Sequence, residues 1–411
     1  MLIEFSVENY KSFRSRQTLS MVAAPRLRKK NNVVTPEVPG EKLPALLKVA
    51  AIYGPNASGK STLLNAIALA YHMARRDASS KSDLPAQPFR FDKQLADKPT
   101  RVEYHFIAEN CRYQFNLAFD NSRVYEEILI SFPRGREELL YRRTYQDGLD
   151  QYKTDFLDGP PELHNVWKKL TSGRSLFITQ AVANSSDEQT QLRIPYKWLT
   201  NLLSISDEID YLGKTAQYLA YKSNSMHVDI SKFLQNIDVP ITKIRTECSA
   251  PENISSQEIV TSELMSAIDG STKYRTTFTH STSLGEAEFD YMEESKGTRS
   301  LVSFYLPWRL LPDRLVMVDE MDSSLHPKLV ADLVKRHLDT SRTGQLIFST
   351  HDTHLMDTKL LRRDQVWLTE RGEDGSTEIR SIHDFAGRDD EDMEKRYYEG
   401  RYRGLPILKE L

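Results

Sequence analysis

The chain has 411 residues, of which 39% are hydrophobic and 27% charged, a composition typical of folded globular proteins rather than disordered chains. Its 55 basic and 58 acidic side chains give a net charge of -3, so the overall charge does not argue for nucleic-acid binding. The N-terminus lacks the pattern of a signal peptide, no window approaches a membrane span, and the two cysteines form no CxxC pair, so we expect a cytoplasmic protein without disulfides or structural zinc.

The N-terminal region is predicted to be rich in strands. Residues 2–7 alternate apolar and polar side chains, and residues 48–53 form an apolar run that ends at Gly54. Three alternating stretches between residues 101 and 145 are separated by short polar pairs, a pattern typical of an antiparallel meander. We therefore expect a β-rich layer here.

The middle of the chain, from about residue 147 to 269, is predicted to be mostly helical, with a break at Pro195. The remainder alternates helices and strands, which indicates a parallel sheet covered by helices. We expect three regions, over residues 1–146, 147–275 and 276–411. The elements predicted in the last region are helices over 296–311 and 328–338 and strands over 314–319, 345–349 and 365–369.

A phosphate-binding loop is the strongest motif, because the stretch from Gly54 to Ser61 fits G-x-x-x-x-G-K-[ST] between a predicted strand and a predicted helix. Backbone N–H groups of such a loop surround the phosphates, Lys60 reaches the β and γ oxygens, and Ser61 ligates Mg²⁺. The expected nucleotide-binding residues are Gly54, Pro55, Asn56, Ala57, Ser58, Gly59, Lys60, Ser61 and Thr62.

A second acidic motif follows the apolar stretch 315–318, where Asp319 and Glu320 are adjacent. A buried strand that ends in two carboxylates delivers them to the edge of a parallel sheet. We expect Asp319 to hold Mg²⁺ and Glu320 to orient and deprotonate the attacking water.

Three further stretches carry a family resemblance. Residues 319–327 resemble the Walker B motif and D-loop of ABC-type ATPase heads, including Rad50, SMC and RecF-like proteins; residues 349–351 resemble their H-loop, and residues 294–298 their signature motif. The resemblance implies an α/β P-loop NTPase with a mixed central sheet, an antiparallel β-subdomain and a helical insertion. It also implies a homodimer or higher oligomer, in which ATP lies between the phosphate loop of one copy and Ser295, Gly297 and Thr298 of another, and His351 contacts the γ-phosphate.

Two other positions belong to the expected nucleotide site. The Q-loop residue, a magnesium ligand in such heads, is assigned to Gln87, with Gln94 and an ordinary loop glutamine as alternatives. Lys11, in the stretch from Asn9 to Phe13, resembles the basic residue that approaches the nucleotide in Rad50-type heads.

The terminal segments narrow the resemblance to stand-alone bacterial ATPases of the AAA_15/AAA_21 class, of the AbiLi and RloA type. Such a resemblance implies an ATP-driven sensor of abortive infection that controls a separately encoded effector, a nuclease or RloB-like toxin. The chain after His351 is too short for a fused TOPRIM nuclease, no heptad run suggests a long coiled coil, and no N-K-x-D motif suggests GTP. The alternative is a RecF- or Rad50-like repair or recombination ATPase that binds DNA; no membrane partner is expected.

Overall fold

The computed structural model describes residues 1–77, 80–186, 190–205, 224–237, 239–248, 274–310, 314–389, 391–402 and 404–405. The chain forms two compact units. Unit 1 consists of Met1–Ser204, Asp313–Asp319 and Ser341–Leu411, and unit 2 of Ile205–Pro312 and Glu320–Thr340. The division into three regions at residues 146 and 275 stays a prediction.

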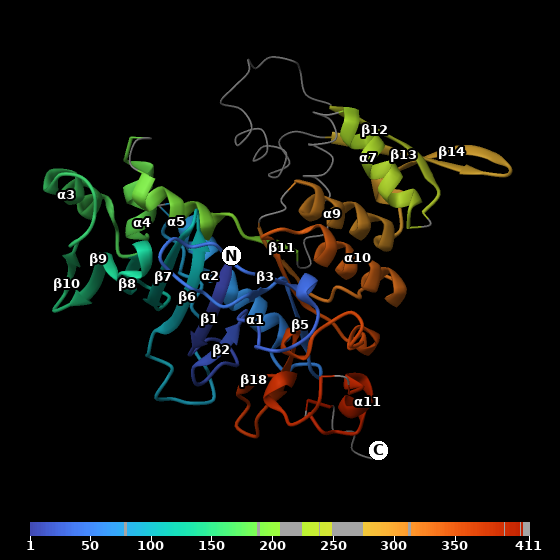
Figure 1. Ribbon diagram of the computed structural model, residues 1–411. Coiled ribbons are helices and arrows are strands. Elements are labelled where there is room, and N and C mark those ends of the chain that lie inside the picture. Colours follow the sequence, from blue (N-terminus) through green and yellow to red (C-terminus); the bar gives the residue numbers. More distant parts are fainter. Residues whose placement is uncertain are drawn as a thin grey trace. The chain divides into compact units, whose positions relative to one another are not determined.

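Unit 1 contains a seven-stranded antiparallel sheet of order β10-β9-β8-β7-β6-β1-β2 (Figure 1). Its inward-facing positions alternate with exposed ones, as in β6, because successive side chains of a strand point to opposite faces. The predicted meander is confirmed and continues through a fourth and a fifth strand, β9 and β10. The pairing of β9 with β8 contains a bulge. The strands are β1 (Leu2–Glu8), β2 (Gln17–Ser20), β6 (Thr100–Ala108), β7 (Cys111–Phe119), β8 (Val124–Phe132), β9 (Glu138–Gln146) and β10 (Leu149–Lys153).

Three helices pack on this sheet, α3 (Pro161–Leu170), α4 (Phe177–Ala183) and α5 (Thr190–Thr200). The Trp198 ring of α5 stacks on the Phe106 ring of β6, with centroids 3.9 Å apart. The expected break at Pro195 is wrong, because this residue lies inside α5. The Pro195 ring is buried, so its packing offsets the backbone hydrogen bond that proline cannot make.

The second sheet of unit 1 has the order β11-β15-β16-β5-β17-β18. Its centre is parallel, since β15, β16, β5 and β17 pair in parallel, and β18 pairs with β17 in the antiparallel direction. Every residue of β5, β15 and β16 is buried, as expected for strands covered on both faces. The strands are β5 (Val49–Tyr53), β11 (Leu203–Ile205), β15 (Leu315–Val318), β16 (Gln345–Ser349), β17 (Val366–Arg371) and β18 (Thr377–Ser381).

Buried Gln345 joins the two sheets of unit 1. Its side-chain oxygen accepts a hydrogen bond of 2.5 Å from the Leu2 backbone N–H, and its amide donates to the carbonyl oxygens of Leu2 and Leu47 at 2.9 and 3.1 Å. A buried amide is stable here because each of its polar atoms is paired. The parallel sheet that carries the phosphate loop is thereby attached to strand β1.

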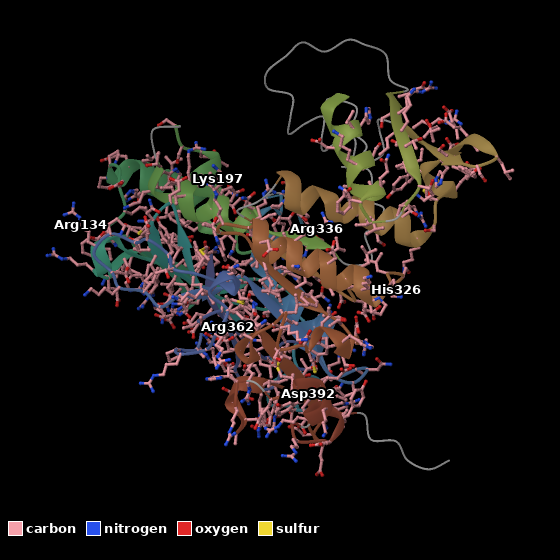
Figure 2. All side chains as sticks on the ribbon, turned by 45° about the vertical axis from the view of Figure 1, so that its right-hand side comes forward. Arg134, Lys197, His326, Arg336, Arg362 and Asp392 are labelled. Atoms are coloured by element: carbon pink, nitrogen blue, oxygen red, sulfur yellow. The ribbon has the colours of Figure 1, made fainter. Side chains whose placement is uncertain are left out.

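The remaining elements of unit 1 are short. Asp392, labelled in Figure 2, caps α11 by accepting a hydrogen bond of 2.9 Å from the Lys395 backbone N–H. The elements are α1 (Lys60–Ile67), α2 (Leu69–Ala74), α11 (Met393–Tyr398), β3 (Val33–Val34), β4 (Leu46–Leu47), and the 3-10 turns η1 (Lys30–Asn32), η2 (Pro133–Gly135), η4 (Thr353–Leu355), η5 (Arg363–Gln365) and η6 (Ile382–Asp384).

Unit 2 combines helices with a three-stranded antiparallel sheet of order β12-β13-β14. The middle of the chain is therefore not as helical as predicted, since β10, β11 and β12 also fall in it. Much of the expected helical insertion, including residues 206–223 and 249–273, lies outside the described residues. The elements are α7 (Asn224–Gln235), β12 (Ile241–Cys248), β13 (Tyr274–Thr282), β14 (Gly285–Asp290), η3 (Tyr291–Glu293), α9 (Lys296–Leu310) and α10 (Pro327–Thr340).

Candidate nucleotide-binding site

The phosphate loop connects buried strand β5 to helix α1. Gly54, Ala57 and Gly59 have positive φ angles of 151°, 60° and 107°. Such angles suit glycine, and a Cβ atom on Gly54 or Gly59 would overlap the hydroxyl of Thr369 or Thr377. Both glycines are thus required by the backbone turn and by the close approach of β17 and β18.

Lys60 is buried at the first position of α1. Its Nζ donates hydrogen bonds of 2.9 and 3.2 Å to the carbonyl oxygens of Gly54 and Pro55. The ammonium group is therefore held over the loop, beside the N–H groups at the start of the helix. A positive charge and the N–H groups of a helix N-terminus in one place form an anion-binding site.

Two threonines outside the motif hold the loop in shape. The Thr369 hydroxyl donates to the Tyr53 carbonyl oxygen at 3.1 Å, so the Ser58 hydroxyl, 2.5 Å away, donates to Thr369. The Thr377 hydroxyl lies 2.8 Å from the Ser58 carbonyl oxygen, to which it can only donate. No local sequence pattern points to either threonine, because each is more than 300 positions from its loop partner.

Lys11 and Gln87 lie together, because the Lys11 backbone N–H donates a hydrogen bond of 2.5 Å to the Gln87 carbonyl oxygen. Asn9 anchors the same loop by accepting from the Phe89 N–H at 2.9 Å and donating to the Lys98 carbonyl oxygen at 2.8 Å. Ser12, next to Lys11, has its hydroxyl 2.8 Å from that of Thr377. Lys11 and Gln87 thus lie next to Ser12, which contacts the Thr377 hydroxyl that supports the phosphate loop. Their backbone contacts do not show that their side chains bind a nucleotide or a metal.

The carboxyl ends of β15 and β16 bring two predicted side chains to one edge of the sheet. The Ser349 hydroxyl at the end of β16 donates to a carboxylate oxygen of Asp319 at the end of β15. Strand β16 lies between β15 and β5, and the Thr350 N–H donates to the Ile52 carbonyl oxygen of β5 at 3.1 Å. Asp319 therefore lies at the same edge as the phosphate loop, one strand removed.

An open pocket of about 820 Å³ borders the loop. His351 is exposed and lines this pocket together with Gly54, Pro55 and Asn56. Residues of β17 and of the C-terminal segment, among them Arg371 and Tyr398, also line it. The predicted H-loop histidine and the start of the phosphate loop thus share one cavity.

The loop after His351 is attached to helix α11. The Thr353 hydroxyl donates to a Glu394 carboxylate oxygen at 2.6 Å and lies 3.0 Å from the Tyr398 hydroxyl. Asp352 accepts hydrogen bonds from the backbone and the ring of His354, and this carboxylate raises the pKa of His354. Residues 351–354, which we call the histidine loop, are therefore held by the carboxylates of Glu394 and Asp352.

In unit 2, the predicted signature motif packs against the predicted D-loop. The Ser295 hydroxyl accepts a hydrogen bond of 3.1 Å from the Thr298 N–H in the first turn of α9. A Cβ atom on Gly297 would lie 2.8 Å from the Ser324 carbonyl oxygen, so this contact requires glycine. Glu320 is exposed, with a positive φ of 48°, and its carbonyl oxygen accepts from the Ser323 N–H at 2.8 Å.

The parallel sheet carries a phosphate loop after β5 and an acid after β15, and β16 lies between these two strands. This arrangement is that of a P-loop NTPase with the head fold of ABC-type ATPases. Its mixed central sheet and its antiparallel sheet are those expected from the sequence. None of the described helices is long and apolar enough to cross a membrane.

The chain belongs to the AAA_21 family, described as "AAA domain, putative AbiEii toxin, Type IV TA system", whose model matches residues 49–163 and 180–357, well over half of the chain. This family is part of the AAA_15/AAA_21 class that the sequence resembles. The matched residues begin at β5 and continue past His351, so they include the phosphate loop, the signature motif and both acids.

Comparison with curated proteins gives no match. Among solved structures, the chain is similar to the SMC head bound to the C-winged helix domain of ScpA (13% identity, TM-score 0.44, covering 92% of this chain and 97% of that chain). It is also similar to the SMC head domain from Thermotoga maritima (15%, TM-score 0.39, 92% and 98%). A third similar structure is the SMC head with an extended coiled coil bound to the C-terminal domain of ScpA, derived from Pyrococcus furiosus (16%, TM-score 0.40, 93% and 97%).

Proposed function

We propose that this protein binds ATP at the phosphate loop and hydrolyses it to ADP and phosphate. The observation that carries the proposal is the position of the Lys60 ammonium, which donates to the Gly54 and Pro55 carbonyl oxygens. The loop that holds it has positive φ angles at Gly54, Ala57 and Gly59. When a nucleotide binds, phosphate oxygens replace these carbonyls as partners of Lys60. Membership of an ATPase family supports the same activity.

Magnesium fits the donors that the site offers. Ser61 is exposed at the start of α1, Asp319 supplies a carboxylate at the same sheet edge, and Gln87 would add an amide oxygen. Mg²⁺ prefers oxygen ligands of this kind and, when bound, neutralises charge on the phosphates. We expect His351 to contact the γ-phosphate from the shared pocket, and Glu320 to act as the general base.

A second copy would complete the site. Ser295, Gly297 and Thr298 lie at the start of α9, a helix of 15 residues whose N–H groups favour an anion. We propose that these residues meet the γ-phosphate bound by another copy, so that the active form is a homodimer around ATP. Hydrolysis would then depend on protein concentration.

Glu320→Gln tests the composite site. This variant should bind ATP, accumulate as a dimer in light-scattering measurements, and lose about 10²- to 10⁴-fold in turnover, because only the base is removed. Lys60→Ala is the matched variant that should bind little ATP and form no such dimer. An ATP-bound Glu320→Gln protein that stays monomeric would contradict the proposed sandwich.

Ser295→Arg tests the contribution in trans. It should keep ATP binding to the single chain and lose turnover. Adding an excess of Lys60→Ala protein, which retains a normal signature motif, should restore part of the activity. If the Ser295→Arg protein alone were fully active, Ser295 would not contribute to ATP hydrolysis.

At the biological level, we propose a cytoplasmic sensor of anti-phage defence that controls a separately encoded toxic effector. The family description, which names a toxin and a toxin–antitoxin system, supports this direction. Purification from cells that also express the neighbouring gene products should yield a stoichiometric complex with one of them. Tight, salt-sensitive and ATP-dependent DNA binding by the protein alone would instead favour the RecF-like repair role.

A further inference from the structure

The three-stranded sheet of unit 2 has one covered face and one uncovered face in the part of the chain that the structure describes. Helix α7 packs on the covered face, where the His227 ring lies 3.2 Å from the Thr246 hydroxyl and where Ile244 and Phe278 are buried. The opposite face carries the alternate residues of each strand, because side chains alternate along a strand. We call it the dipolar face and define it by Lys243, Arg245, Glu247, Arg275, Thr277, Thr279, Glu286, Glu288 and Asp290.

Charge is separated across the dipolar face. Lys243, Arg245 and Glu247 lie on β12, Arg275 and two threonines on β13, and Glu286, Glu288 and Asp290 on β14. Two ion pairs form within the face, Arg245 with Glu247 at 2.8 Å and Arg275 with Asp290 at 2.9 Å. Lys243, Glu286 and Glu288 are exposed and have no ion pair with a described residue, so these three charges are available to a partner.

The strand register puts Lys243, Thr279 and Glu288 in one row, because Lys243 pairs with Thr279 and Thr279 with Glu288. A two-fold axis parallel to β13 and above this face would exchange the two edge strands and keep the position along them. Lys243 of one copy would then lie over Glu288 of the other, and the reverse contact would form at the same time. The pattern is therefore complementary to itself, which is what a two-fold interface requires.

We propose that the dipolar face is a self-association surface whose partner is the same face of a second copy. Two sheets that pack in this way lie about 10 Å apart, with two Lys243–Glu288 ion pairs at the sides. Thr277, Thr279 and Arg275, which is paired with Asp290 of its own chain, lie on the central strands. The tips of both β13–β14 hairpins would come to the same end of the pair. Leu284 at the tip, which is 98% exposed in the single chain, would then lie near its copy in the partner.

The dipolar face is distinct from the proposed ATP sandwich, since it contains no residue of the phosphate loop or the signature motif. It is nevertheless connected to that motif. The ring of His280 on β13 lies 2.6 Å from the buried carboxylate of Glu294, which directly precedes Ser295. Assembly through this face would link ATP-bound pairs into larger oligomers.

The test uses the full chain with Lys60→Ala, without nucleotide, so that the ATP sandwich cannot contribute. Sedimentation velocity at low salt should show a dimer that weakens as salt rises. Lys243→Glu and Glu288→Lys should each weaken association about tenfold or more, because each places like charges opposite one another twice. Lys335→Glu, on an exposed position of α10, is the control and should leave association unchanged.

Rescue makes the test specific. An equal mixture of the Lys243→Glu and Glu288→Lys proteins should form a mixed dimer, and one chain carrying both substitutions should dimerise again. A monomer under all conditions, or single variants that associate normally, would overturn the proposal. Nucleic-acid binding by the basic strand β12 would also overturn the proposal. In that case a labelled oligonucleotide would bind the starting protein, and Lys243→Glu would abolish this binding without rescue by Glu288→Lys.

Discussion

The hydroxyl of Thr377 and the carbonyl oxygen of Ser58 lie 2.8 Å apart although 319 positions separate the two residues. Strand β18 therefore supports the phosphate loop from the opposite end of the chain. The same hydroxyl is 2.8 Å from that of Ser12, so the N-terminal segment joins this support. The shape of the loop depends on contacts that its own eight residues do not make.

Thr377→Val should weaken ATP binding about tenfold, because it leaves the buried Ser58 carbonyl oxygen without its hydrogen bond and costs about 1–2 kcal/mol. Thr377→Ser, which keeps a hydroxyl, should bind nearly as well as the natural protein. Titration calorimetry with ATP measures both. Equal affinities for the valine and serine variants would show that the contact does not shape the loop.

Gly297→Ala should reduce turnover about tenfold and leave ATP affinity of the single chain unchanged. The added methyl group would meet the Ser324 carbonyl oxygen at 2.8 Å and displace either the signature motif or the D-loop. Gly173→Ala is the control, since its nearest neighbour would be 3.8 Å away. Steady-state phosphate release measures turnover, and normal rates for Gly297→Ala would contradict the close packing.

Glu127→Gln should lower the free energy of unfolding of the natural protein by about 2–4 kcal/mol. The fully buried Glu127 carboxylate accepts hydrogen bonds from the Phe177 and Ile178 N–H groups at 2.7 and 3.1 Å and faces Arg143 at 3.9 Å. Burial raises the pKa of Glu127, while the Arg143 charge opposes that rise. An amide would turn a donor toward a donor. Urea unfolding measures the loss, and Glu126→Gln on the same strand should cost far less.

His354 should make the stability of the histidine loop depend on pH. Its hydrogen bond to Asp352 raises the pKa of His354 above the ordinary 6.5. Because the pKa of His354 is higher in the folded state, the protonated ring stabilises the folded protein fully at pH values below the unfolded pKa of 6.5. This stabilisation is lost as the pH rises through the folded pKa. The melting temperature of the natural protein should thus exceed that of His354→Gln at about pH 5.5 and approach it at about pH 9. If the difference in melting temperature were the same at both pH values, the His354–Asp352 ion pair would not be its cause.

Much of the fold could be predicted from local patterns. The strands at 49–53, 315–318 and 345–349 are short apolar runs, and their order with the intervening helices indicated a parallel sheet. Pro195 and the strands of the middle region were mispredicted because burial and strand pairing, which depend on distant residues, overrode local preference.

The sequence by itself determined the chemistry of the phosphate loop, because Gly54, Gly59 and Lys60 are close together in the chain and their spacing already specifies a turn before a helix. Only the tertiary structure decided what supports that loop and what lies beside it. Thr369 and Thr377 came to it through β-sheet pairing, and Gly297 met Ser324 through packing of the first turn of α9 on the D-loop. Contacts of this kind depend on the path of the whole chain, so no local pattern could reveal them.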